Sequence, residues 1–248
     1  MWRINRERVV LLGGAAASVL QVAHPVVARG VAHHSAFRKD SAGRLARTLD
    51  AVYAVAFGPM EDVRRVASGV ARAHAAVRGD GYSAFDPEAQ KWVMATLIMG
   101  SASMFERYVG ALARSELDRL LAENERFGGV FGLPHGSLPK CWPDFLGYWH
   151  DMLHGPVLGS DPLCGEVAAA VLKPETPGML RMMSPVLTLL AIADMPPALT
   201  ARLGLPDPRK AAKLTRVLRA ALPVVVRHAG PRLRFAPRYL EALARTGI

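Results

Sequence analysis

Cysteine and strand-like patterns are both scarce in this sequence. Its 248 residues include only two cysteines, Cys141 and Cys164, which do not form a C-x-x-C pair. Two isolated cysteines exclude a disulfide framework and a zinc site built from cysteine pairs, and this usage is the default of a reducing, cytoplasmic setting. No segment alternates apolar and polar residues with a period of two. We therefore expect an all-α, cytoplasmic protein.

The sequence also lacks a linker and an internal repeat. Its 18 prolines and 22 glycines punctuate the whole chain, but no Pro/Ser/Gly-rich segment separates two halves. With 51% hydrophobic residues, a chain of this length can bury a substantial core. We predict a single domain over residues 1–248.

Acidic residues are in the minority. The 31 lysines and arginines exceed the 21 aspartates and glutamates, which gives a net charge of +10 at pH 7. Such an excess favours binding to nucleic acid or to a membrane surface. The arginines are scattered, however, and no basic stripe is interleaved with aromatic residues. We interpret the charge as that of a solvated, arginine-rich surface and expect no nucleic-acid partner.

One long segment, from Val9 to Ala28, carries no charge and follows a basic N-terminal stretch. This combination is superficially typical of a signal peptide or a membrane anchor. Two consecutive glycines, a glutamine and a His-Pro pair interrupt the segment. We therefore predict a buried helix from Val9 to about Ala23 and no transmembrane segment.

Two helices separated by a Gly-Pro break organise the N-terminal part of the chain. Glycine ends helices well and proline is tolerated in the first turn of the next helix, so the break at Gly58-Pro59 predicts a helical hairpin from Arg44 to His74. Counted from the break, Arg47 lies eleven residues back and His74 lies fifteen residues on. At ~1.5 Å per residue, the two residues are at nearly the same height along the hairpin.

Polar side chains mark one face of each helix in this hairpin. Arg44, Arg47 and Thr48 are spaced i, i+3 and i+4 and share a face. His74 follows Val70 by four residues within a stripe of valines. One interpretation is that His74 faces the polar trio across a gap that holds a cofactor. The alternative is that the helices pack at ~8–10 Å, with His74 as a hydrogen-bonded core residue.

A series of short motifs runs through the same region and continues beyond it. The principal ones are His24-Pro25, His33-His34-Ser35, Arg44-x-x-Arg47-Thr48, Phe57-Gly58 and His74-x-x-Val77-x-Gly79, and weaker ones are Leu138-Pro139, Phe145-x-x-Tyr148 and Met195-Pro196. In order and spacing they resemble the oxygenase domain shared by bacterial latex-clearing proteins and the MpaB oxygenases. The resemblance is strongest over residues 2–79. It implies a globin-like helical core with additional helices and a haem b cofactor.

The resemblance also implies roles for individual residues. His74 would be the proximal iron ligand, and Arg78, one turn further, would pair with a haem propionate. Arg47 and Thr48 would lie on the distal side, where a fixed cation and a hydroxyl assist reactions of dioxygen. Arg44 would support them or pair with the second propionate. Dioxygen and an apolar, isoprenoid-like small molecule would be the partners.

The sequence departs from the latex-clearing proteins at two positions. They have a lysine where this chain has Arg47, and an arginine does not deprotonate to ligate iron. The position of their proposed distal glutamate corresponds here to Ala28, so His34 or His33 is the candidate for the base. His24, His33 and His34 are expected to line one space near the start of the Arg44 helix. Cleavage of polyisoprene itself is not implied.

Two further patterns carry weaker predictions. His150 and His154 are four residues apart, as in zinc proteases, but an aspartate replaces the glutamate of that motif, and Gly155 ends the helix at once. We interpret them as helix-terminal histidines without a metal. In a helix that begins at Asp86-Pro87, the methionines Met94, Met99 and Met104 either fill the core or line an apolar substrate pocket.

Two functional hypotheses follow. The first is a haem b-dependent oxygenase acting on an apolar small molecule. The second is a non-catalytic all-α protein that binds haem or another apolar ligand, which is favoured by the lack of a clear catalytic base.

Overall fold

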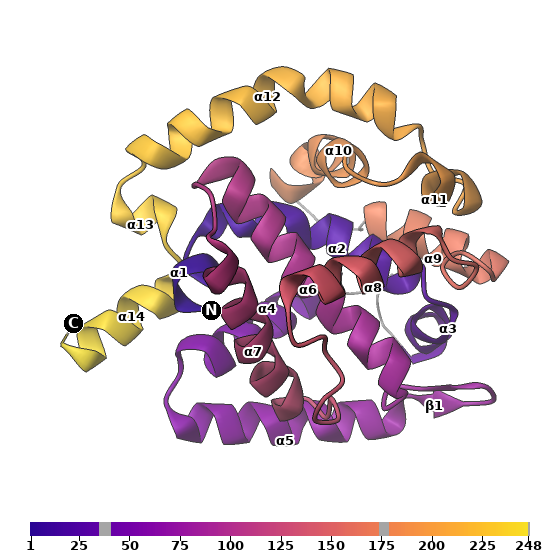
Figure 1. Ribbon diagram of the computed structural model, residues 1–248, viewed down its shortest axis with the longest axis horizontal. Helices are drawn as coiled ribbons and strands as arrows, with labels where there is room; N and C mark the ends of the chain where they lie inside the picture. The colour runs from indigo at the N-terminus through magenta and orange to yellow at the C-terminus, as the bar shows by residue number, and fades with distance from the viewer. Residues whose placement is uncertain (35–40, 174–178, 248) are drawn as a thin grey trace.

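The computed structural model describes residues 1–34, 41–173 and 179–247, and it describes their side chains except those of residues 41–46, 179–181 and 183. Nearly all of its regular structure is helical (Figure 1). Within these ranges the strands are β1 (Arg78–Gly79) and β2 (Tyr82–Ser83), which form one antiparallel hairpin. The predicted all-α fold is confirmed, whereas the globin-like arrangement of its core stays a prediction.

Fourteen α-helices and one 3-10 helix, η1, follow one another in these ranges. Their bounds are α1 (Trp2–Asn5), η1 (Arg8–Gly13), α2 (Gly14–Val22), α3 (Pro25–His34), α4 (Ser41–Phe57), α5 (Met60–Ala76), α6 (Pro87–Tyr108), α7 (Arg114–Val130), α8 (Trp142–His154), α9 (Pro162–Leu172), α10 (Met179–Ile192), α11 (Pro197–Arg202), α12 (Pro208–His228), α13 (Pro231–Arg234) and α14 (Pro237–Thr246).

Helix α6 runs diagonally through the centre of the molecule (Figure 1). It starts where the sequence predicts, because the Asp86 carboxylate accepts a hydrogen bond of 2.8 Å from the Ala89 amide and a proline occupies the first turn. Its Trp92 side chain is fully buried and donates its indole hydrogen to the carbonyl of Leu20, 2.7 Å away. That bond fastens α2 to the central helix.

The predicted buried helix over Val9–Ala23 is wrong in its first half. The chain forms the 3-10 helix η1 up to Gly13 and becomes α-helical only from Gly14. A Cβ atom at Gly13 would lie 2.9 Å from the Cγ atom of Met104, so the chain approaches α6 too closely here for a side chain. In the second half, Val19 and Leu20 are buried as expected.

No single helix in the described ranges is long and apolar enough to cross a membrane. The pair formed by Arg8–Val22 and Pro25–His34 passes that test together, on length and composition, but is bent by 101° at the break between its two parts.

Helices α4 and α5 form the predicted hairpin with its break at Gly58-Pro59. A Cβ atom at Gly58 would lie 2.4 Å from the carbonyl oxygen of Ala54, so only glycine fits there. Helix α5 follows the lower edge of the molecule in Figure 1 and has α4 as its main neighbour. Val66 is the only buried residue of α5, so this helix lies at the periphery of the core.

The two ends of the chain are joined by a buried ion pair. Glu7 is only 1% exposed, and its carboxylate accepts hydrogen bonds of 2.8 and 3.0 Å from the guanidinium of Arg234. Arg6 lies 3.4 Å from the same carboxylate. The backbone continues the junction, since the amide of Ala236 donates to the carbonyl of Arg6 at 2.7 Å.

Replacing Arg234 by methionine is expected to lower the free energy of unfolding by about 2–4 kcal/mol, because the Glu7 carboxylate then stays buried without its main partner. Urea unfolding at neutral pH measures this. The matched control is Arg232→Met, since the Arg232 side chain is exposed and makes no ion pair with the described residues. Equal losses in the two variants would show that the buried pair contributes nothing specific.

Candidate functional site

His74 lies in the last turn of α5 and is partly buried. Its Nδ1 atom is inaccessible to solvent and has no hydrogen-bonding partner among the described residues. The edge of the ring meets the ring of Phe85, with the centroids 6.0 Å apart. Burial lowers the pKa of His74, so the imidazole is held neutral. A neutral imidazole with an unused ring nitrogen is the form that binds metal ions.

The β-hairpin that follows α5 places Tyr82 beside two histidines that are distant from it in the sequence. His34, at the end of α3, has its Nε2 atom 2.8 Å from the hydroxyl of Tyr82 on β2. The ring of His33 lies 5.4 Å from the same tyrosine ring. Arg78 is exposed on β1, opposite Ser83 in the hairpin. Tyr82 was not predicted as a site residue, because its contacts are with residues distant in the sequence and the pattern of its own segment is typical of a loop.

The proposed distal residues lie on α4. Arg47 and Thr48 are exposed there. Arg44 belongs to the same helix, but its side chain lies outside the described residues. Arg44, Arg47 and Thr48 all lie on α4, which packs against α5 as the predicted hairpin requires. Their exposure means that the polar face opens towards solvent rather than into a sealed pocket.

The three N-terminal histidines are not gathered around one space. His24 is 7% exposed at the bend before α3, whereas His33 and His34 are exposed at the other end of that helix. The ten residues of α3 separate them by ~15 Å. Burial lowers the pKa of His24, although the charges of Asp86 and Glu88 act in the opposite direction.

Four other buried polar atoms have no hydrogen-bonding partner among the described residues. They are Nε of Arg6, Oε1 of Gln90, Nδ1 of His24 and the hydroxyl oxygen of Tyr148 on α8, and the last two belong to side chains whose pKa is shifted by burial. Burial raises the pKa of the Tyr148 hydroxyl, and the Lys91 ammonium lies 4.4 Å from the centroid of its ring. The neutral forms of both side chains are therefore favoured.

A cavity of about 610 Å³ lies between α1, α4, α5 and α7, and we call it the lower cavity. Its apolar lining includes Val55 and Ala56 of α4, Val63 of α5 and Phe127 of α7. Arginines and glutamates of α1 and α7 also line it, among them the ion pair of Arg119 and Glu123 at 2.9 Å and the ion pair of Arg3 and Glu116. Its volume is typical of ligand sites, which span ~300–1,000 Å³.

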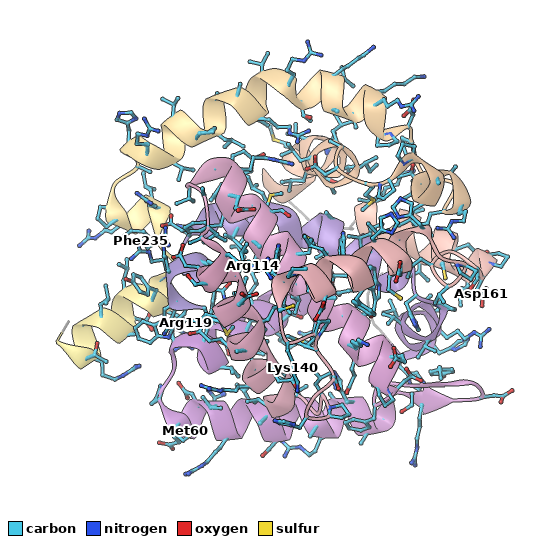
Figure 2. The ribbon with its side chains drawn as sticks, viewed as in Figure 1. Met60, Arg114, Arg119, Lys140, Asp161 and Phe235 are labelled. Carbon is cyan, nitrogen blue, oxygen red and sulfur yellow. The ribbon has the colours of Figure 1, made fainter. Side chains whose placement is uncertain are left out.

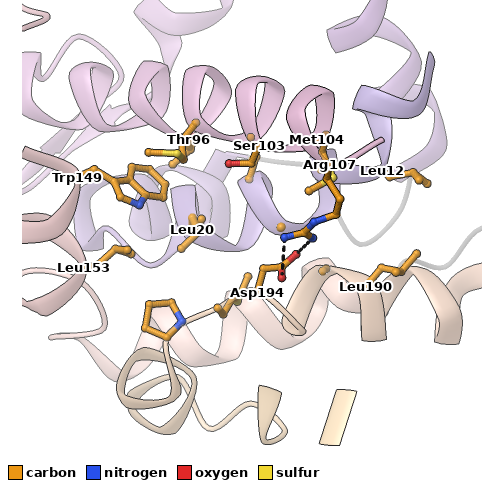
Figure 3. Close-up of a pocket in the computed structure, with 18 of the residues that line it drawn as sticks. Leu12, Leu20, Thr96, Ser103, Met104, Arg107, Trp149, Leu153, Leu190 and Asp194 are labelled. Carbon is orange, nitrogen blue, oxygen red and sulfur yellow. Dashed lines mark hydrogen bonds and ion pairs between the residues drawn. The ribbon is translucent and has the colours of Figure 1, made fainter. Parts of the chain in front are cut away.

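A second cavity of about 320 Å³, here the upper cavity, lies between η1, α2, α6, α8 and α10 (Figure 3). Met99 and Met104 line it, as one interpretation of the sequence expected, whereas Met94 does not. Figure 3 shows Trp149 and Leu153 at one end of the lining and Leu12 and Leu190 at the other, with the ion pair of Arg107 and Asp194 between them. The predicted catalytic and haem-binding residues whose side chains are described, namely His34, Arg47, Thr48, His74 and Arg78, line neither cavity.

His150 and His154 stack on each other at the end of α8, with ring centroids 4.2 Å apart, and both are exposed. The Nδ1 atom of His154 contacts the carbonyl of His150 at 2.9 Å. Within the described ranges, no group of three or more histidine, cysteine, aspartate or glutamate residues is placed to hold a metal ion. A haem iron differs in needing only one or two protein ligands.

The described residues define a predominantly all-α protein with two largely apolar cavities. The chain belongs to the family described as ER-bound oxygenase mpaB/B′/rubber oxygenase, catalytic domain, whose model matches residues 1–227. This confirms the resemblance found in the motifs. The family identity does not by itself place a cofactor or a substrate in this chain.

Two curated relatives share part of the sequence. The uncharacterized protein Mb2261 of Mycobacterium bovis and the uncharacterized protein Rv2237 of Mycobacterium tuberculosis are each 31% identical over 153 residues, which is 57% of this chain. The chain spans 59% of the length of each relative. No solved structure matches.

Acidification is expected to destabilise the protein through its buried histidines. The pKa of His24 and that of His74 are lowered from the usual 6.5 by burial, so the unfolded chain takes up protons at a higher pH than the folded chain does. The stability they contribute is complete above pH 6.5 and is lost as the pH falls through the lowered folded-state values. His24→Leu should therefore reduce the fall in unfolding free energy between neutral pH and about pH 5, where carboxylates begin to titrate. Urea unfolding at a series of pH values checks this, and an unchanged fall would contradict it.

Proposed function

We propose that this chain is a haem b-dependent oxygenase that acts on an apolar small molecule, with His74 as the proximal iron ligand. The observation that carries the proposal is the neutral His74 imidazole, whose Nδ1 atom is buried without a partner. Membership of an oxygenase family supports the reaction class. Haem b, when bound, supplies the dioxygen chemistry that side chains lack.

The residues around His74 fit a haem in chemical type. Val63, Val66, Val70 and His74 are spaced three or four residues apart and share one face of α5. Val63 lines the lower cavity, so this apolar face leads from the cavity to the histidine. An apolar surface excludes water from an iron site, and the edge contact with Phe85 limits rotation of the imidazole.

Cationic and hydroxyl groups on neighbouring elements supply the remaining functions. Arg78, four residues after His74, would pair with one propionate, and Arg44 would pair with the other or support the distal side. Arg47 would stabilise negative charge that develops on the oxidant, and the Thr48 hydroxyl would pass on a proton. His34 would act as the base, and its 2.8 Å contact with the Tyr82 hydroxyl gives it a group with which to exchange a proton.

Dioxygen and an apolar, isoprenoid-like molecule are the proposed substrates, and the cytoplasm is the proposed location. The upper cavity is a suitable place for part of an apolar substrate, since Met99, Met104 and Trp149 line it.

A second candidate is a non-catalytic protein that carries haem or another apolar ligand. The exposure of Arg47 and Thr48 favours it, because charge stabilisation by these groups weakens in water. Oxygen consumption with candidate apolar substrates distinguishes the enzyme from the carrier.

Protein produced with sufficient iron and haem precursor is expected to show a Soret band that His74→Ala abolishes or strongly reduces. The alanine removes the bond that anchors the iron. His150→Ala and His154→Ala are the matched controls, because these exposed histidines lie on a different helix, α8. Equal haem loss in all three variants would place the site elsewhere, and folded protein that takes up no added hemin would refute haem binding.

Electron paramagnetic resonance of the ferric protein is expected to show high-spin iron or iron with an exchangeable sixth ligand. Arg47 stands where the latex-clearing proteins have lysine, and a guanidinium stays protonated and offers iron no lone pair. Cyanide and imidazole should then bind without displacing a side chain. A low-spin bis-histidine signal at neutral pH would contradict this and would indicate ligation by His33 or His34.

A further inference from the structure

The outward face of α12 is apolar from Leu214 to Val225. Leu214 is 72% exposed, Val217 81%, Val224 60% and Val225 61%. With the exposed Leu218 and Ala221, they recur every three or four residues, so they form one continuous stripe on the helix surface. We call these six residues the outer stripe. A stripe of this kind normally faces a core.

A different face of α12 packs against the rest of the protein. Its buried residues are Pro208, Ala211, Thr215 and Val226. Figure 1 shows α12 arching over α10 at the outer edge of the molecule, and Figure 2 shows side chains projecting from it into open space. The outer stripe is therefore additional to the apolar face that holds the helix in place.

Positive charge accompanies the outer stripe. Residues 208–240 contain nine lysines and arginines and no aspartate or glutamate. Lys210, Lys213, Arg216 and Arg227 on α12 are exposed and make no ion pair with the described residues. Arg219 differs, since it donates to Asp194 at 2.7 Å on the packed side. The free cations thus lie beside the apolar stripe on the outward side of the helix.

We propose that α12 docks the protein on a membrane surface rich in anionic lipid. A helix with an apolar stripe bordered by lysine and arginine lies in the plane of the interface, with its apolar side chains among the acyl chains and its cations near the headgroups. Each basic side chain near an anionic surface strengthens binding by about fivefold.

Charge argues against a second copy of this chain as the occupant. Helices that pair through such a stripe normally place opposite charges along its borders. Two α12 helices would set one basic border against another in either orientation, because residues 208–240 offer no acidic partner. Anionic lipid offers acyl chains to the outer stripe and negatively charged headgroups to the lysines and arginines beside it.

Sedimentation with vesicles tests the proposal. The full chain is expected to bind vesicles of phosphatidylcholine with phosphatidylserine at low salt, to bind pure phosphatidylcholine at least tenfold more weakly, and to be released by high salt. The triple variant Leu214→Gln/Val217→Thr/Val225→Thr should abolish binding. It should unfold as the wild type does, since all three side chains are exposed.

The charge contribution has its own variant and a matched control. Lys213→Gln/Arg216→Gln should weaken vesicle binding by roughly tenfold or more. Lys140→Gln/Lys173→Gln removes the same charge at exposed positions outside α12 and should leave binding nearly unchanged. No binding by the wild type, or equal binding by the stripe variant, would overturn the proposal. A dimer in analytical ultracentrifugation that only the stripe variant dissociates would overturn it in favour of a second copy.

Discussion

Burial of α6 is the constraint on which the rest of the fold depends. The segment from Trp92 to Phe105 carries no charge, and a helix that is apolar all round is stable only when other elements cover it on every side. Helices η1, α2 and α7 pack on it, and α1 and α12 complete the cover. The α4–α5 hairpin is mostly outside this cover. His74 therefore lies on a helix at the periphery of the core. Local unfolding of this helix costs less free energy than unfolding of the centre.

Local signals in the sequence were sufficient where a turn or a cap decides the structure. Gly58-Pro59 and Asp86-Pro87 act through their own backbone, so the hairpin break and the start of α6 were predictable. The 3-10 helix η1 was not, because the contact of Gly13 with Met104 depends on residues far away in the sequence. The outer stripe of α12 was equally hidden. Periodicity reveals an apolar face, but it does not say whether anything covers that face.

The same limit applies to the candidate site. The valine stripe singled out His74, and its burial and lowered pKa agree with a ligand role. Spacing also placed Arg47 and Thr48 on one face of α4, but their exposure depends on how distant helices pack. Tyr82 became visible only when α3 and the β-hairpin were seen together. Pairings of this kind carry no local signature, since each partner alone resembles an ordinary loop or helix end.

The ion pair of Glu7 and Arg234 extends beyond the segment that the family model matches. The family model matches residues 1–227, whereas the partner of the buried Glu7 carboxylate is Arg234. A fragment of residues 1–227 would contain Glu7 without Arg234. The carbonyl of Arg6 would also lack the hydrogen bond that it accepts from the amide of Ala236. The segment matched by the family model and the segment joined by these interactions thus have different end points. A fragment that keeps both interactions must extend at least to Ala236, beyond the segment that the family model matches.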